Sequence, residues 1–234
     1  MAPLSFQTVS RSSLYMEVAA QIRAAILDGS MSSGDRLPPE RELARQFQVG
    51  RATIREALRH LQAQGLLAAR GRTSPLETAG VDDAASRFGE ALSHVVRLQE
   101  VSLADLVELR VSMETTALVR AAAAPRPGHL QEAHDALARM ERADVQAGEF
   151  YEADVAFHLA LVAAAGNQAL LLVMRAVKDA VRLHLGKTLS ARSLTKVRAR
   201  IVDEHRAILR SVERGEGEAA ATHLRRHLSG FYGT

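Results

Sequence analysis

Helical periodicity continues from residue 82 to residue 230. It limits the folds that this chain can adopt more than any other feature of the sequence. Glycine or proline breaks the periodicity at 125–128 (PRPG), Gly148, Gly166, Gly186, Gly215 and Gly217. The segments between these breaks predict seven helices, at about 82–100, 103–123, 129–146, 149–165, 167–186, 191–213 and 216–230. Ser102 and Asp105 have the spacing of a capping box at the start of the second. Seven helices without a strand pattern predict an all-α bundle.

Composition excludes several classes of protein. The chain has 234 residues, of which 47% are apolar and 24% charged, so a disordered polyelectrolyte is ruled out. The absence of cysteine excludes disulfides, a cysteine nucleophile, a thiolate zinc site and an iron–sulfur cluster. No run of 18 apolar residues predicts a membrane span, and the N-terminal residues do not resemble a signal peptide. We therefore expect a cytoplasmic protein with no membrane partner.

The first third of the chain has a different pattern. Residues 14–28 have an apolar helical stripe, and helices are predicted at about 39–46 and 51–64, with Gln48-Val49-Gly50 as a tight turn between them. Two helices joined by a short turn that contains glycine are typical of a helix-turn-helix. The segment LLAARGRTSPLET after Gly65 predicts a β-hairpin wing. We expect a winged helix-turn-helix domain at residues 1–78 and an all-α domain at 79–234, so the fold is mainly α.

Arginine distribution points to a nucleic-acid partner. Residues 1–78 hold 10 Arg, no Lys and 7 acidic residues, which accounts for the whole net charge of +3. Arg51, Arg55 and Arg59 form a ridge on the second helix of the motif, because residues four apart share a helix face. Backbone N–H groups near Gly50, Arg51 and Ala52 could bind a phosphate. Arg41 and Arg45 form a similar pair, and Arg70 and Arg72 lie near the wing tip, where a minor groove favours arginine. The alternative is a solvated basic face neutralised by nearby glutamates.

Histidines at buried positions of the second domain point to a metal. Asp154 and His158 lie four residues apart within an almost entirely apolar helix, so they share one face. His205 lies in a long helix beside isoleucines, and His227 follows His223 by one turn in the last helix. Three imidazoles and a carboxylate would suit Zn²⁺, Ni²⁺ or Mn²⁺. The sequence alone does not show that these helices converge, and His223 is the alternative to His227.

The segment LPPERELARQFQVGRATIREALRHLQAQGLL, residues 37–67, resembles the DNA-binding domain of the GntR family of bacterial transcription regulators. The resemblance implies that Arg41, Arg51 and Arg55 contact DNA, with Gly50, Ala52 and Thr53 beside them. Two departures are present. A hydroxyl residue is more usual in the family at the position of Gly50, and Pro75 stands in a wing that usually reads Gly-x-Gly-x-Phe-Val, so the role of the wing is left open.

Residues 85–230 resemble the FCD ligand-binding domain of the FadR branch of the same family. The matching pieces are residues 105–110 (DLVELR) with Glu114, Asp154-x-x-Phe157-His158, Ala165-Gly166-Asn167, Glu204-His205 and His227-Leu228. The resemblance implies that Asp154, His158, His205 and His227 bind a divalent metal. It also implies that Arg110 is the counter-charge for a small carboxylate or hydroxy-acid effector, to which Asn167 could add a polar contact. The alternative for Arg110 is a surface ion pair with Glu114.

These observations predict a ligand-responsive transcription regulator. We expect a homodimer that binds a palindromic double-stranded DNA operator, because a two-fold symmetric protein matches two half-sites. The resemblance favours repression of transcription over activation. Two alternatives stay open: a metal-responsive regulator whose metal is structural, and a metal-dependent hydrolase.

Overall fold

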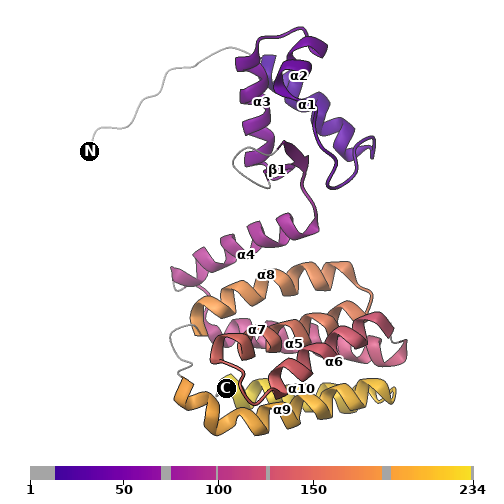
Figure 1. Cartoon of the computed structure of the whole chain (residues 1–234), viewed down its shortest axis with the longest axis vertical. Coiled ribbons are helices and arrows are strands. Elements are labelled where there is room, and N and C mark those ends of the chain that lie inside the picture. Colours follow the sequence, from indigo (N-terminus) through magenta and orange to yellow (C-terminus); the bar gives the residue numbers. More distant parts are fainter. Residues whose placement is uncertain (1–13, 70–74, 99, 125–126, 186–190, 233–234) are drawn as a thin grey trace, which may run out of the picture. The chain divides into compact units, whose positions relative to one another are not determined.

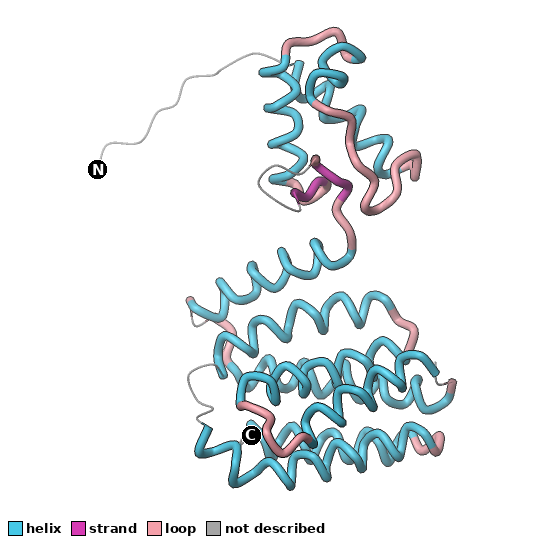
Figure 2. Tube along the Cα trace, in the orientation of Figure 1, coloured by secondary structure: helices cyan, strands magenta, loops and turns pink. Residues whose placement is uncertain are grey.

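The computed structural model describes residues 14–69, 75–98, 100–124, 127–185 and 191–232, and in helices near these gaps some side chains are left undescribed. The chain divides into two compact units, one ending at Ala84 and the other beginning at Ala85. Figure 1 labels the elements along the chain, and Figure 2 separates helices from strands and loops. The prediction of a mainly α fold is confirmed.

The first unit is built on three short helices, α1 (Leu14–Leu27), α2 (Glu40–Gln46) and α3 (Arg51–Ala63). The buried face of α3 consists of Ile54, Ala57, Leu58 and Leu61, which pack into the small core of this unit. Leu43 is the buried residue of α2. Leu14 begins the apolar stripe of α1 but is exposed, because it lies in the first turn at the edge of that core.

A tight turn joins α2 to α3. The N–H of Val49 donates to the carbonyl oxygen of Ala44 (3.1 Å), and Gln48 adopts a φ of 54°. That left-handed conformation is uncommon for a residue with a side chain. Gly50 is the N-cap of α3 in an extended conformation, and a Cβ atom built on it would meet nothing within 4 Å. A hydroxyl residue would therefore fit at Gly50, and its absence does not reflect crowding.

The wing begins with strand β1 (Leu67–Ala69) and ends with strand β2 (Leu76–Thr78). The two short strands are antiparallel, with Ala68 opposite Glu77. Pro75 directly precedes β2, where the missing N–H of proline costs no ladder hydrogen bond. Arg36 forms an isolated bridge with Glu77, and the N–H of Leu37 donates to the carbonyl oxygen of Leu76 (2.9 Å). Arg70 and Arg72, which we expected at the wing tip, lie outside the described residues.

The second unit is all helical in the part that the structure describes. Its helices are α4 (Val81–Arg97, which starts within the first unit), α5 (Leu103–Ala123), α6 (Pro127–Glu141), α7 (Ala147–Ala164), α8 (Gln168–Leu185), α9 (Ala191–Glu213) and α10 (Gly217–Tyr232). The predicted capping box of Ser102 and Asp105 is present at the start of α5. The core lies where α7 packs against α5, α6 and α8, and where α10 packs against α5 and α9. The seven helices agree with the predicted bundle.

Helix α6 ends five residues earlier than the sequence predicts, at Glu141 rather than residue 146. Arg198 of α9 explains the difference. Its guanidinium donates to the carbonyl oxygens of Met140 (3.1 and 3.2 Å) and Ala143 (3.4 Å), and to that of Arg142. Carbonyl groups at a helix end need such partners, and a side chain from a distant helix supplies them here.

Candidate metal centre and nucleic-acid interface

Four side chains from three helices meet in the core of the second unit. Asp154 and His158 come from α7, His205 from α9 and His227 from α10. One ligand atom from each lies within 4.8 Å of the others, and all four residues are buried. Oδ1 of Asp154 lies 3.0 Å from Nε2 of His205 and 3.9 Å from Nε2 of His158. The structure therefore brings together the four residues of the sequence-predicted ligand set.

His223, the alternative to His227, does not join the group. It is half-buried on α10, where its Nδ1 lies 3.3 Å from the guanidinium of Arg226. His227, one turn later on the same helix, is 2% exposed and its ring stacks on that of His158 with the centroids 5.5 Å apart. Of these two histidines on α10, His227 and not His223 belongs to the group of four converging side chains.

Each of the three imidazoles uses its Nδ1 atom for an oxygen outside the group. The partners are Glu114 for His158 (2.6 Å), the carbonyl oxygen of Ile201 for His205 (2.7 Å) and Glu204 for His227 (2.8 Å). Carbonyl and ionised carboxylate oxygens only accept hydrogen bonds, so Nδ1 is the donor in each case. A neutral imidazole that donates from Nδ1 keeps its lone pair on Nε2. The three outer contacts thus fix tautomers that suit metal ligands.

The Nε2 atoms show why the cluster fits a cation. Those of His158 and His205 are buried and have no hydrogen-bond partner among the described residues. Nε2 of His205 lies 3.0 Å from Asp154, but the pair does not meet hydrogen-bond geometry. Buried polar atoms without partners are costly, and two lone pairs aimed at one carboxylate form a ready ligand set. The residues present therefore fit a divalent metal ion.

Electrostatics support the same arrangement. Burial by itself would raise the pKa of Asp154, but its close contacts with the three histidines outweigh that effect and lower the pKa. Burial lowers the pKa of His227 to about 4, against the opposing effect of Glu204. The cluster therefore holds an ionised carboxylate and at least one neutral imidazole near pH 7, which are the protonation states that metal ligands need.

Arg110 lies in α5 and forms an ion pair with Glu114, four residues later, at 2.7 Å between Nε and Oε1. The pair that we considered as an alternative is thus present, and it is buried rather than on the surface. The other oxygen of Glu114 is the one that contacts His158. Burial would raise the pKa of Glu114, but the charge of Arg110 and the hydrogen bonds from Arg110 and His158 hold it at about 2. Glu114 therefore connects the proposed effector residue to a proposed metal ligand.

Asn167 begins α8. Its side-chain oxygen accepts from the N–H groups of Ala169 (3.0 Å) and Leu170 (3.2 Å), which is the geometry of a helix N-cap. Its observed contacts are thus local to the helix. Glu114 and Glu204 are functional candidates that the sequence reasoning did not assign. Their only signal was their place within the quoted motif pieces, Glu114 with Arg110 and Glu204 beside His205.

In the first unit, the arginines of the helix-turn-helix fall into two groups. The side chains of Arg51 and Arg59 are exposed on α3 and form no hydrogen bond or ion pair with any residue that the structure describes. Arg55 forms an ion pair with Glu40 of α2 (2.8 Å), and Arg45 forms one with Glu42 (2.6 Å). Arg41 and Ala52 are exposed, and Thr53 is half-buried. The alternative of a solvated basic face neutralised by glutamates therefore applies to Arg45 and Arg55 but not to Arg51.

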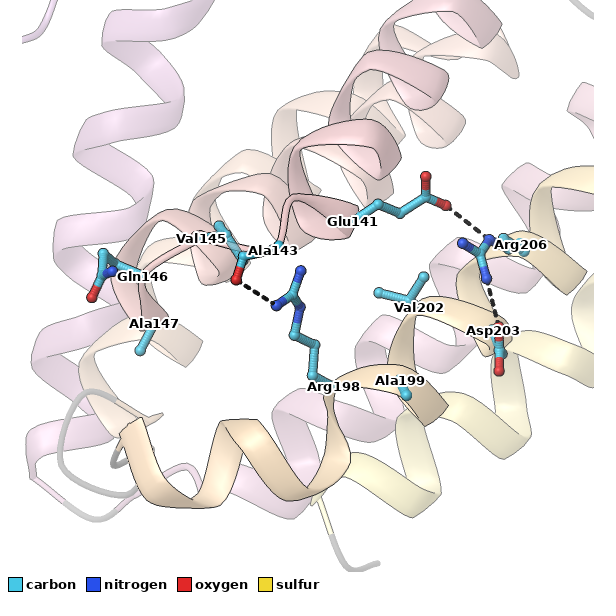
Figure 3. A pocket seen from close by; sticks show the side chains of 10 residues that line it. All are labelled: Glu141, Ala143, Val145, Gln146, Ala147, Arg198, Ala199, Val202, Asp203 and Arg206. Carbon is cyan, nitrogen blue, oxygen red and sulfur yellow. Dashed lines mark hydrogen bonds and ion pairs between the residues drawn. The ribbon is translucent and has the colours of Figure 1, made fainter.

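A cavity of about 650 Å³ lies between the α6–α7 connection and α9 (Figure 3). Two arginines from α9 project into it, as the side-chain view shows. Arg198 is held by the carbonyl oxygens at the end of α6, and Arg206 is paired with Glu141 (2.8 Å) and Asp203 (2.7 Å). Both guanidinium groups thus already have partners, and these contacts join α9 to the end of α6 and to the segment that follows it.

A winged helix-turn-helix followed by a helical domain with a buried histidine–carboxylate cluster defines a class of DNA-binding regulators. Residues 14–74 match the bacterial regulatory proteins of the gntR family, and residues 105–230 match the FCD domain. The chain belongs to the GntR family, in the branch that carries an FCD domain. It is a transcriptional regulator and not an enzyme, so the hydrolase alternative is set aside. No helix in the described part of the chain is long and apolar enough to cross a membrane.

Individual relatives agree with this assignment. The chain is 30% identical to the HTH-type transcriptional regulator LutR of Bacillus subtilis, over 87% of this chain and 93% of LutR. It is 28% identical to the putative L-lactate dehydrogenase operon regulatory protein of Escherichia coli, over 91% of this chain and 83% of that protein. Among solved structures, Streptococcus agalactiae GntR has the same fold, with a TM-score of 0.64, 23% identity and coverage of 94% and 100%.

Proposed function

We propose that this regulator senses a small carboxylate through a divalent metal held by Asp154, His158, His205 and His227. The observation that carries the proposal is the outer contact made by each histidine, which leaves Nε2 as the ligand atom in all three. Three nitrogens and one carboxylate suit Zn²⁺, Ni²⁺ or Mn²⁺ and leave coordination positions for a further ligand. When bound, the metal would supply a net positive charge and those positions to an anionic effector.

The effector that we propose is a small carboxylate, with a 2-hydroxy acid as the leading subclass. The name of the Escherichia coli relative refers to an L-lactate dehydrogenase operon, and L-lactate is such an acid. Arg110 would hold the carboxylate with its guanidinium, whose Nε donates to Glu114. Asn167 would contribute its side-chain amide N–H. The path from Arg110 through Glu114 to His158 would then make effector and metal binding depend on each other.

For the DNA-binding unit, we propose that a homodimer binds a palindromic operator through α3, and that it acts as a repressor. Arg51, Arg41 and Arg55 are the proposed contacts to phosphate or bases, with Gly50, Ala52 and Thr53 close to the DNA backbone. Arg55 would exchange its partner Glu40 for DNA, or hold α2 and α3 together. Arg70 and Arg72 of the wing are proposed to reach the minor groove.

The experiment that tests the sensor is metal analysis of the purified wild type, the His205→Ala variant and the His223→Ala variant. His223→Ala is the matched control, because it removes an imidazole near the cluster but outside it. We expect one metal ion per chain in the wild type and the control, and less than about a tenth of that in His205→Ala. Equal metal in all three proteins, or none in the wild type even after addition of Zn²⁺, Ni²⁺ or Mn²⁺, would contradict the site.

A second measurement, at constant metal content, distinguishes effector sensing from the alternative of a metal-responsive regulator. Small carboxylates, including L-lactate, acetate and glycolate, are added to the metal-loaded protein, and thermal unfolding and operator binding are recorded. A shift in both by one acid supports effector sensing. If only removal of the metal changes operator binding, the metal itself is the signal.

A further inference from the structure

Helix α4 has two apolar faces, and only one of them packs against its own domain. Ala85, Gly89, Ser93 and Val96 are buried, and Val96 belongs to the core of the second unit. The other face is a stripe of six exposed residues, which we call the outer stripe: Val81, Ala84, Phe88, Ala91, Val95 and Leu98. Phe88 is 45% exposed and Leu98 is 61% exposed. A row of apolar residues left in water on one helix indicates a contact surface.

The spacing of the outer stripe indicates what kind of surface it fits. Successive members lie three, four, three, four and three residues apart, which is the a/d pattern of a heptad repeat. Leu98 continues the helical spiral beyond the last residue of α4, since its N–H donates to the carbonyl oxygen of His94 (3.1 Å). A heptad seam packs against another helix at a shallow angle, and the same seam on a second copy is the partner of matching shape.

We propose that α4 pairs with α4 of a second copy of this chain, antiparallel, along the outer stripe. In this arrangement each pair of facing residues has numbers that sum to the same value, so Phe88 faces Ala91, Ala84 faces Val95, and Val81 faces Leu98 of the second copy. The two inner pairs thus combine a larger with a smaller side chain, which fills space evenly. A parallel pairing would instead place Phe88 on Phe88 and Ala84 on Ala84, with crowding at one level and a gap at the next.

Charge favours the antiparallel direction as well. The first turn of α4 carries Asp82 and Asp83, and its last turn carries His94 and Arg97. Antiparallel pairing brings each acidic end beside the basic end of the second copy, and it also opposes the two helix dipoles. Parallel pairing would place like charges together at both ends. The interface is isologous, as a two-fold dimer requires.

This inference rests on the homodimer of the proposed function and names its surface. The first test measures the mass of the full-length, metal-loaded protein in solution by light scattering and sedimentation. Phe88→Glu and Val95→Glu each place two charges in the seam, and Ser86→Glu is the matched control on an exposed position of α4 outside the stripe. We expect the dissociation constant of the dimer to rise at least about 100-fold in the first two variants and to stay unchanged in the control. Unfolding temperature and metal content verify that each variant is folded.

The second test uses the absence of natural cysteines. Single variants Ala84→Cys and Val95→Cys are oxidised separately and as a mixture. We expect disulfide-linked dimers that combine the two variants in the mixture and none from Ala84→Cys alone, because two copies of residue 84 would lie about 16 Å apart along the pair. Efficient crosslinking of Ala84→Cys to itself would overturn the antiparallel arrangement. If the wild type is a dimer and none of these substitutions affects its mass or crosslinking, the α4 surface alone is overturned. If the wild type is a monomer at all concentrations, the homodimer is overturned as well.

Discussion

Nε2 of His205 lies 3.0 Å from Oδ1 of Asp154, although the two residues belong to different helices, α9 and α7. Both residues are buried, and the His205 ring also packs edge-on against Phe157 at a centroid distance of 4.6 Å. The contact places polar atoms of two long helices next to each other inside an apolar core. Such a contact is costly unless the charges are compensated, so a cation at this place would stabilise the fold as well as give it a function.

Glu114→Gln is expected to weaken metal binding without removing a ligand. The change takes away the charge that orients His158 and leaves Arg110 buried beside a neutral amide. We expect metal affinity to fall by about 10- to 100-fold and the free energy of unfolding by about 1–3 kcal/mol. Competition with a chelator and urea unfolding measure the two effects. Glu108→Gln, exposed on the same helix, is the control, and equal metal affinity in both variants would exclude an orienting role for Glu114.

Acid is expected to destabilise the metal-free protein between pH 6.5 and about 4. Burial lowers the pKa of His227 to about 4 in the folded state, while the unfolded chain has the ordinary value near 6.5. In this window the unfolded state binds a proton that the folded state does not bind, so stability rises with pH and is lost as pH falls. Urea unfolding of chelator-treated protein at several pH values tests this. A His227→Gln variant should show a shallower dependence, and an identical slope would contradict the assignment.

The helices of both units could be predicted from sequence because their signals are local. Caps, glycine stops and apolar spacing lie within a few residues of the boundaries they set, as at Ser102 and Asp105. The end of α6 could not be predicted in this way. Arg198, which binds the carbonyl oxygens at that end, is about 55 residues away in the sequence. A single sequence does not show which distant side chain will reach a helix end.

The candidate site was predictable in part for the same reason. Asp154 and His158 are four apart on one helix, so their proximity follows from spacing alone. Their meeting with His205 and His227 depends on how α7, α9 and α10 pack, and the sequence supported it only through a family resemblance. The orienting contact between Glu114 and His158 joins residues 44 positions apart, and a motif gives no geometry for such a contact.

Gln48→Gly is expected to stabilise the turn of the helix-turn-helix. Gln48 has a φ of 54°, where a side chain costs about 1 kcal/mol and glycine costs little. Part of the gain is lost to the greater freedom of glycine in the unfolded chain. We expect the amides of α2 and α3 to exchange hydrogen about 2-fold more slowly. Gln48→Ala keeps the strain and is the control; faster exchange in Gln48→Gly than in Gln48→Ala would contradict the argument.

Arg51→Ala is expected to weaken operator binding and to reduce its dependence on salt. Arg51 is exposed on the first turn of α3 and has no partner within the described residues, so its guanidinium can bind DNA without losing an internal ion pair. Removal of one phosphate contact should lower the slope of log affinity against log salt by about 1. The slope is measured by fluorescence anisotropy on a DNA site selected with the wild type from a random library. Arg36→Ala removes another exposed arginine of the same unit, one that is paired with Glu77, and serves as the control. If Arg51 instead reads a base, the loss of affinity will be large on the selected site and small on random DNA; an affinity and slope equal to those of the control would exclude Arg51 from the interface.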